Sequence, residues 1–194
     1  MKALCIIGSP RDNGSTVLIV DQIIEGMRSV GIEAKRQLLG SLHIGFCRGC
    51  RSERPFRGCR VTGECIQHDD MGVLIGQLMQ ADIVLLASPS YWGEVTAQLK
   101  TFIDRCVPLC NARTGETQVP PGKIGISVAI RAGSDPAENL HLVNTIEHYF
   151  GHLGITPVGR LTVENISEPT DFEPETLQKA YDLGAHMIGD VYVG

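Results

Sequence analysis

Short apolar runs alternate along this chain with longer segments of helical spacing. Residues 3–7 and 82–88 are continuous apolar runs, the pattern of parallel strands covered on both faces. Between residues 15 and 31, apolar side chains recur every three or four positions and end at a glycine. This spacing predicts an amphipathic helix with Ser15 or Thr16 as its N-cap.

The rest of the chain continues the alternation of strand and helix. The predicted further strands are 33–39, 123–130 and 156–163, and the predicted further helices are 68–81, 96–109, 136–154 and 173–193. Strands that alternate with helices indicate an α/β fold with a doubly wound parallel sheet. We predict a flavodoxin-like three-layer sandwich, a five-stranded parallel sheet in the order 2-1-3-4-5. We expect a single domain over residues 1–194, with a cysteine-rich loop insertion at 46–68.

Composition excludes several classes of partner. The 17 basic and 22 acidic residues give a net charge of −5. With no long basic block, this argues against a nucleic-acid partner. No window has the length of a membrane span, and the first residues do not resemble a signal peptide. We therefore expect no membrane partner and a cytoplasmic protein, in a compartment where thiols stay reduced.

A loop between the first strand and the first helix has the residues of an anion site. In GSPRDNGST, at 8–16, small and polar residues let N–H groups and hydroxyls converge at a helix N-terminus. Arg11 can add a charge-assisted hydrogen bond. The loop lacks the lysine of a triphosphate loop and the glycine spacing of a dinucleotide site, so a single phosphate monoester fits better. An ordinary strand-to-helix turn is the alternative.

Three segments make the chain recognisable. GSPRDNGST, SPSYWGEVTAQLKTFIDR and the cysteine stretch that ends in GECIQHDDM resemble the NADPH-dependent FMN reductase-like branch of the flavodoxin superfamily. They resemble its iron–sulfur flavoproteins most closely. The resemblance covers about residues 1–157. It implies bound FMN, with its phosphate held by residues of the first motif, namely Ser9, Arg11, Asn13, Ser15 and Thr16.

The loops that follow the third and fourth strands are the expected ring site, since ligands of such sheets bind beyond the carboxyl ends of the strands. The resemblance implies that the flavin ring is bound by Pro89, Ser90, Tyr91, Trp92, Gly93, Gly133 and Ser134. Ordinary packing of both aromatic residues within the loop is the alternative. The last two residues are the weaker assignment, because Arg131 stands where a small residue is expected.

Four of the seven cysteines form a C-x2-C-x8-C-x5-C pattern, Cys47, Cys50, Cys59 and Cys65. Four thiolates can hold a [4Fe–4S] cluster or tetrahedral zinc. The iron–sulfur flavoprotein pattern has two residues between the second and third cysteines, so the segment RSERPF looks inserted. We expect a cluster here; reduced or reactive thiols, zinc and disulfides remain alternatives. Five arginines would offset the charge of a cluster, namely Arg48, Arg51, Arg54, Arg57 and Arg60.

The predicted function is a flavin-dependent oxidoreductase that passes electrons between a reduced donor and an acceptor. The donor would be a ferredoxin-like carrier if the cluster is present, or NAD(P)H in an FMN or quinone reductase without one. No side chain is assigned as catalytic, because the flavin carries the chemistry. A non-catalytic redox sensor or a zinc module is the alternative from another class. The family resemblance also implies a homodimer or homotetramer.

Overall fold

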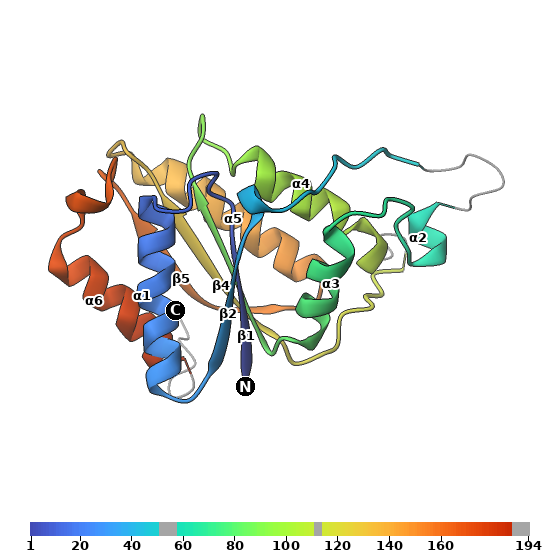
Figure 1. Ribbon diagram of the computed structural model, residues 1–194, viewed down its shortest axis with the longest axis horizontal. Helices are drawn as coiled ribbons and strands as arrows, with labels where there is room; N and C mark the ends of the chain where they lie inside the picture. The colour runs from blue at the N-terminus through green and yellow to red at the C-terminus, as the bar shows by residue number, and fades with distance from the viewer. Residues whose placement is uncertain (51–57, 111–113, 188–194) are drawn as a thin grey trace.

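The computed structural model describes residues 1–50, 58–110 and 114–187 (Figure 1). The strands are β1 (Lys2–Ile7), β2 (Glu33–Leu38), β3 (Ile83–Pro89), β4 (Ile124–Ile130) and β5 (Thr156–Val163). The α-helices are α1 (Ser15–Ser29), α2 (Cys59–Thr62), α3 (Met71–Gln80), α4 (Ala97–Arg105), α5 (Pro136–His152) and α6 (Pro174–Ala185). The 3-10 helices are η1 (Leu39–Ser41), η2 (Val107–Leu109) and η3 (Pro169–Asp171).

The five strands pair in parallel in the order β2-β1-β3-β4-β5, which confirms the predicted flavodoxin-like sheet. Strand β3 is buried up to its last residue, as expected for a central strand of apolar sequence with helices on both faces. The edge strands β2 and β5 have more exposed residues and more polar sequences. The mixed composition of the two outer strands therefore follows from their place in the sheet.

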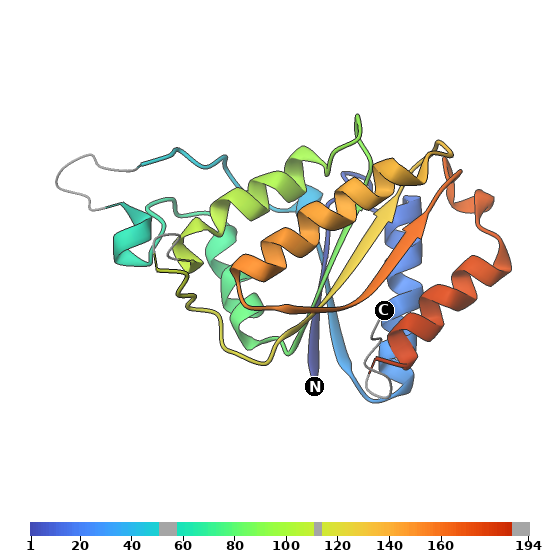
Figure 2. The same ribbon diagram turned by 180° about the vertical axis from the view of Figure 1, so that it is seen from behind.

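Two helical layers cover the sheet, as Figures 1 and 2 show from opposite sides. Helices α1 and α6 pack together on one face, and α3, α4 and α5 lie on the other. The α1–α6 contact depends on glycine, because a Cβ on Gly26 would lie 2.0 Å from the carbonyl oxygen of Tyr181. A Cβ on Gly184 would lie equally close to the carbonyl oxygen of Ile23.

Several helix boundaries differ from the prediction. Helix α4 ends at Arg105 and not at residue 109, and the 3-10 helix η2, which contains Pro108, follows it. The N-cap of α1 is Gly14, not Ser15 or Thr16. Extended backbone at Gly14 lets its carbonyl accept the first helical hydrogen bonds, so the two hydroxyl residues fall inside the first turn. Helix α6 ends at Ala185, and the end of the predicted helix, residues 188–193, lies outside the described residues.

The fold brings three loops to one end of the sheet, where the parallel strands finish. These are the β1–α1, β3–α4 and β4–α5 loops, at the top of Figure 1. Helix α4 runs from this end toward α2 and the segment that carries the four cysteines. Among the described residues, no helix combines the length and the apolar character needed to cross a bilayer.

Candidate functional site

The first turn of α1 leaves polar groups unused, as a phosphate site requires. In the part of the chain that the structure describes, no side chain caps this helix, and the buried hydroxyl of Ser15 has no hydrogen-bond partner. Thr16 is also buried. The first N–H groups of a helix have no intrahelical acceptor and lie at the positive end of its dipole. Together, the hydroxyls and N–H groups fit a phosphate monoester.

The other residues predicted for the phosphate site, Ser9, Arg11 and Asn13, differ in their burial and contacts. Ser9 is buried, and its hydroxyl accepts a hydrogen bond from the N–H of Arg11 (3.1 Å) and donates one to the same residue's carbonyl (3.2 Å). Ser9 therefore shapes the loop. The side chain of Arg11 lies beside Gly14, where an added Cβ would be 3.3 Å from Nε. Asn13 is exposed at the rim.

Thr96, a residue that the sequence analysis gave no role, fastens the phosphate loop to the next loop. Its hydroxyl donates to the carbonyl of Gly8 (2.6 Å), and its N–H donates to the hydroxyl of Ser88 (3.0 Å). The same hydroxyl caps α4. A Cβ on Gly8 would lie 2.8 Å from this oxygen, so the position requires glycine. A threonine just before an amphipathic run is an N-cap signal that could have identified it.

The β3–α4 loop folds into a tight hairpin that exposes its aromatic side chains. The N–H groups of Tyr91 and Glu94 each donate to the other residue's carbonyl, at 3.0 and 3.2 Å. Between them, Trp92 (φ 56°) and Gly93 (φ 77°) form a type I′ turn. Left-handed backbone at a non-glycine residue costs about 1–2 kcal/mol. The side chain of Trp92 is fully exposed, so it does not pack as core within this chain.

The β4–α5 loop is joined to this hairpin by a side chain of α5. The hydroxyl of Ser90 donates to the carboxylate of Glu138, which also pairs with Arg131 at 3.0 Å. The guanidinium of Arg131 lies over Gly133, where a Cβ would be 2.5 Å from a terminal nitrogen. Ser134 is exposed at the rim. Only the place of Glu138 in a first helical turn, where acids are favoured, could have drawn attention to it.

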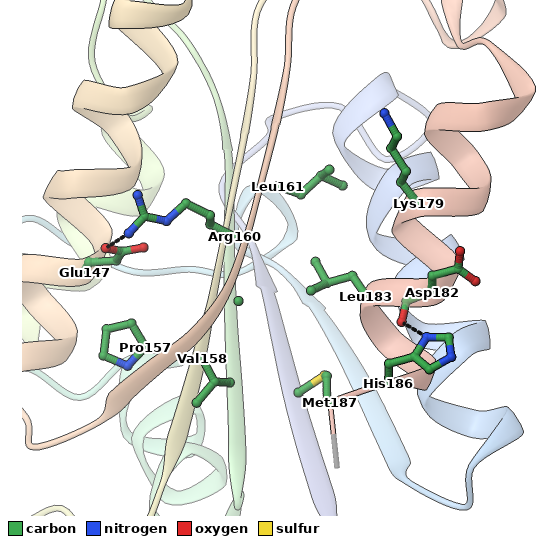
Figure 3. A pocket seen from close by; sticks show the side chains of 11 residues that line it. Glu147, Pro157, Val158, Arg160, Leu161, Lys179, Asp182, Leu183, His186 and Met187 are labelled. Atoms are coloured by element: carbon green, nitrogen blue, oxygen red, sulfur yellow. Dashed lines mark hydrogen bonds and ion pairs between the residues drawn. The ribbon is translucent and has the colours of Figure 1, made fainter. Parts of the chain in front are cut away.

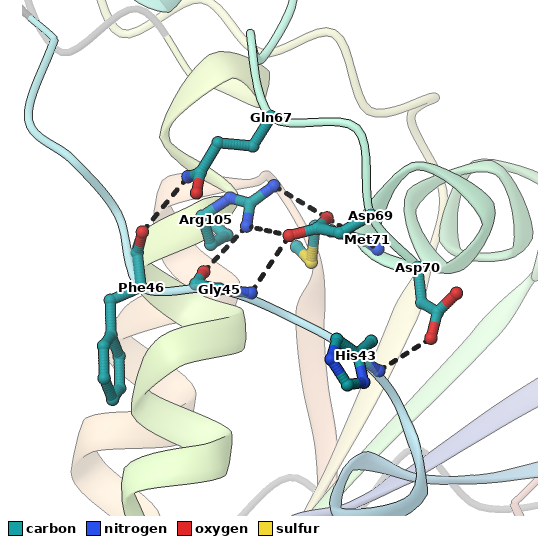
Figure 4. A network of polar contacts seen from close by, with 8 residues as sticks. All are labelled: His43, Gly45, Phe46, Gln67, Asp69, Asp70, Met71 and Arg105. Atoms are coloured by element: carbon teal, nitrogen blue, oxygen red, sulfur yellow. Dashed lines mark hydrogen bonds and ion pairs between the residues drawn. The ribbon is translucent and has the colours of Figure 1, made fainter.

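A network of polar contacts closes the base of the cysteine segment (Figure 4). The buried guanidinium of Arg105 binds both oxygens of Asp69, at 2.6 and 2.9 Å, and donates to the carbonyl of Gly45 at 2.7 Å. Hydrogen bonds from Arg105 hold the pKa of Asp69 at about 2, although burial acts to raise it. We call residues 43–46 and 67–71 the neck. Further hydrogen bonds across it join His43 to Asp70 and Phe46 to Gln67.

The four predicted cluster ligands lie beyond the neck but are not gathered. Cys47 is exposed, and Cys50, Cys59 and Cys65 are half-buried. In the described part of the chain, which includes all four, no three His, Cys, Asp or Glu side chains are close enough to hold a metal. Three of the five arginines (51, 54 and 57) lie outside the described residues. The donor set suits a [4Fe–4S] cluster in its chemistry, but its present arrangement does not fit one.

Other cysteines and a histidine pair have structural places. Cys5 and Cys106 are buried, and burial raises the pKa of each thiol to about 12, whereas Cys110 is half-buried. Tyr149 donates a hydrogen bond to the sulfur of Cys106 (3.2 Å). His148 and His152 approach to 3.1 Å between their Nε2 atoms on the exposed face of α5. No third ligand accompanies them among the described residues.

A large cleft lies away from these loops, between α5, β5 and α6 (Figure 3). Its volume is about 870 Å³, and its lining includes Glu147, Arg160, Asp182 and Leu183. None of the predicted site residues lines it. We place the functional site at the carboxyl ends of the strands rather than in this cleft, since unused anion-binding groups are found there.

Comparisons with known proteins identify the family and the relatives of the chain. The profile of the NADPH-dependent FMN reductase family matches residues 1–166. An iron-sulfur flavoprotein from Archaeoglobus fulgidus is 36% identical over 188 residues, covering 96% of this chain and 79% of that protein. One from Methanocaldococcus jannaschii is 32% identical over 150 residues, covering 77% of this chain and 72% of that protein. The solved structure of an NAD(P)H:quinone oxidoreductase from Methanothermobacter marburgensis has a TM-score of 0.75, with 13% identity over 96% of each chain, a likeness of fold alone.

Proposed function

The chain belongs to the NADPH-dependent FMN reductase family, and we propose that it passes electrons from a reduced donor to an acceptor through one bound FMN. It is an FMN-dependent oxidoreductase of this family. When bound, FMN supplies the one- or two-electron chemistry, and the protein binds and orients it. The observation that carries the proposal is the buried, unpartnered hydroxyl of Ser15 beside the open N-terminus of α1.

Each loop of the proposed site has its own task. Ser15, Thr16 and Arg11 hold the phosphate, with Asn13 at the rim and Ser9 shaping the loop. The hairpin and the β4–α5 loop orient the ring, and the exposed aromatic side chains exclude water from it. The ring contacts are assigned to Pro89, Ser90, Tyr91, Trp92, Gly93, Gly133 and Ser134.

Identification of the released flavin tests this proposal. Protein purified in the dark and then denatured should release FMN, at about one molecule per chain, because the phosphate loop has unused donors for a monoester and lacks the dinucleotide spacing. Reconstitution should favour FMN over riboflavin, which has no phosphate. Release of FAD, or equal affinity for FMN and riboflavin, would remove the assignment of the phosphate site.

For the cysteine segment, we propose a [4Fe–4S] cluster on Cys47, Cys50, Cys59 and Cys65, with a ferredoxin-like donor. The four thiols and the names of the two relatives support it. Binding would require the segment beyond the neck to rearrange, and the cost of the longer connection grows slowly with its length. The lack of any group of three metal ligands among the described residues favours the alternative, an NAD(P)H-dependent FMN or quinone reductase without a cluster. A thiol redox sensor or a zinc module is the third candidate.

Anaerobic purification separates these candidates. Iron and sulfide in equal amounts, lost together in Cys47→Ala and Cys65→Ala but kept in Cys110→Ala, would support the cluster. FMN without iron after reconstitution would favour the reductase without a cluster. Stoichiometric zinc in colourless protein would favour the zinc module.

We also propose that a second copy of the chain completes the flavin site, in a homodimer or homotetramer. The fully exposed Trp92 supports this, because tryptophan is enriched at protein–protein interfaces relative to the rest of the surface. Sedimentation should show an oligomer at micromolar concentration, and a monomer with full flavin occupancy would contradict it. We further propose a single domain, with the 46–68 loop as an insertion, that acts in the cytoplasm, where its exposed thiol at Cys47 stays reduced.

A further inference from the structure

One carboxylate joins the two loops that are assigned to the flavin ring. Glu138 accepts a hydrogen bond from the hydroxyl of Ser90, after β3, and pairs with Arg131, after β4. Its Cγ and Cδ also lie 3.7 and 3.9 Å from the place of a Cβ on Gly93. Glu138 therefore lies against the hairpin and holds it to the end of β4.

The ion pair of Glu138 with Arg131 also neutralises a positive charge beside the expected ring site. The side chain of Arg131 is 15% exposed and that of Glu138 is 27% exposed, so water screens this pair less than a surface pair. The guanidinium also donates to the carbonyl of Asp135 at 2.6 Å, and its buried Nε has no hydrogen-bond partner among the residues that the structure describes. Without Glu138, a partly buried positive charge would remain unbalanced at this position.

A second Ser–Glu–Arg set, whose glutamate also lies on α5, serves as an internal control. Glu147 accepts a hydrogen bond from Ser127 (3.0 Å) and pairs with Arg160 (2.9 Å), as Figure 3 shows for the pair. Ser127 and Arg160 are partners in the β4–β5 register. This second set is built like the first, but it lies along the sheet instead of at the ends of the strands.

We propose that Glu138 is a positioning residue that fastens both ring loops and, by neutralising Arg131, sets the reduction potential of the bound flavin. The inference rests on the proposed FMN site. Reduction adds negative charge to the ring, so a nearby unbalanced cation favours the reduced form and an unbalanced carboxylate disfavours it. The tether and the charge therefore give separate, measurable effects.

The charge is tested with the midpoint potential of protein-bound FMN. Glu138→Gln should raise the potential by about 30 mV, and Arg131→Gln should lower it by a similar amount. This shift corresponds to a tenfold change in the ratio of affinities for oxidised and reduced FMN in a two-electron couple. The double variant should return close to wild type, and Glu147→Gln should not differ from wild type. Shifts of the same sign in both single variants, or no shift, would overturn the charge role.

The tether is tested with Ser90→Ala, a mild change that leaves both charges in place. Affinities for FMN and riboflavin should fall by the same factor, about tenfold, because the lost hydrogen bond to a charged group holds the ring loop and not the phosphate. Unchanged affinity for both flavins would overturn the tether. Wild-type protein that binds no flavin would instead overturn the proposed function, and the same titration reveals that case.

Discussion

The phosphate loop and the cysteine segment are both candidate cofactor sites, but folding prepares them to different degrees. At the phosphate loop, the donors are the N–H groups of a helix end and the hydroxyls of its first turn, so formation of α1 places them. In the cysteine segment, the donors are four side chains beyond a closed neck, and no three of them form a metal-holding group among residues 1–50, 58–110 and 114–187. A site made from a helix end is built with the fold, whereas a site made from loop side chains is built with its ligand.

Helix α4 anchors both regions. Thr96 at its start holds the ends of β1 and β3, and Arg105 at its end holds the neck. These residues are nine positions apart, which corresponds to about 13 Å along a helix axis. Changes at either end of α4 can therefore be compared within one rigid element.

The largest expected effect concerns the phosphate loop. Replacing Ser15 and Thr16 by alanine should weaken FMN binding by about a hundredfold or more, since each lost hydrogen bond to a charged group is worth about 1.5–3 kcal/mol. Riboflavin affinity should be unchanged in a fluorescence titration. Ser29→Ala, at the other end of α1, is the control, because its hydroxyl bonds only to the carbonyl of Gly26 among the described contacts. Retained FMN affinity in the double variant would contradict the prebuilt site.

The next effect concerns the neck. Arg105→Met should lower the free energy of unfolding by about 3–5 kcal/mol, because it leaves the carboxylate of Asp69 without its partner. Adding Asp69→Leu should restore much of the loss, since the unpaired charge is then removed. Lys100→Ala, which breaks an exposed pair on the same helix, should cost less than about 1 kcal/mol in the same denaturant titration. Equal losses in both single variants would mean that the neck is no more than a surface contact.

Acid should weaken the neck within a defined window. The pKa of Asp69 is lowered from 3.8 to about 2, so its contribution is complete above pH 3.8 and is lost as the pH falls through 2. The difference corresponds to about 2 kcal/mol of stability. Denaturation of wild type and Asp69→Asn at pH 6 and pH 2 should show the smaller pH dependence in the variant. An identical pH dependence in the two proteins would argue against this contribution.

The smallest expected effect is that of replacing Trp92, which should raise the stability of the flavin-free protein and lower its affinity for FMN. Trp92→Asn should stabilise the flavin-free protein by about 1 kcal/mol, because asparagine tolerates the left-handed backbone of a type I′ turn better. The same change should weaken FMN binding, since an aromatic cover is lost. Thermal unfolding and flavin titration measure the two effects. Stabilisation without loss of FMN affinity would make Trp92 a turn residue alone.

The apolar pattern by itself predicted where the strands and helices lie, because periodicity reports which residues are buried. The sheet order and the three loops at the carboxyl ends followed from the small number of topologies that alternating strands and helices adopt. The N-cap of α1 was predicted one or two residues too late, because backbone at a glycine, and not a side-chain hydroxyl, begins the helix.

Only the tertiary structure placed Thr96 between two strand ends, Glu138 between two loops and Arg105 within the neck. Each of these side chains contacts residues far away in sequence, and no local pattern encodes such contacts. Tertiary structure also decided that, in the part of the chain that the structure describes, no three of the four predicted cluster cysteines are grouped closely enough to hold a metal. The spacing of the cysteines along the sequence shows that four thiols are available as ligands. The distances between their sulfur atoms depend on how the backbone that connects them folds.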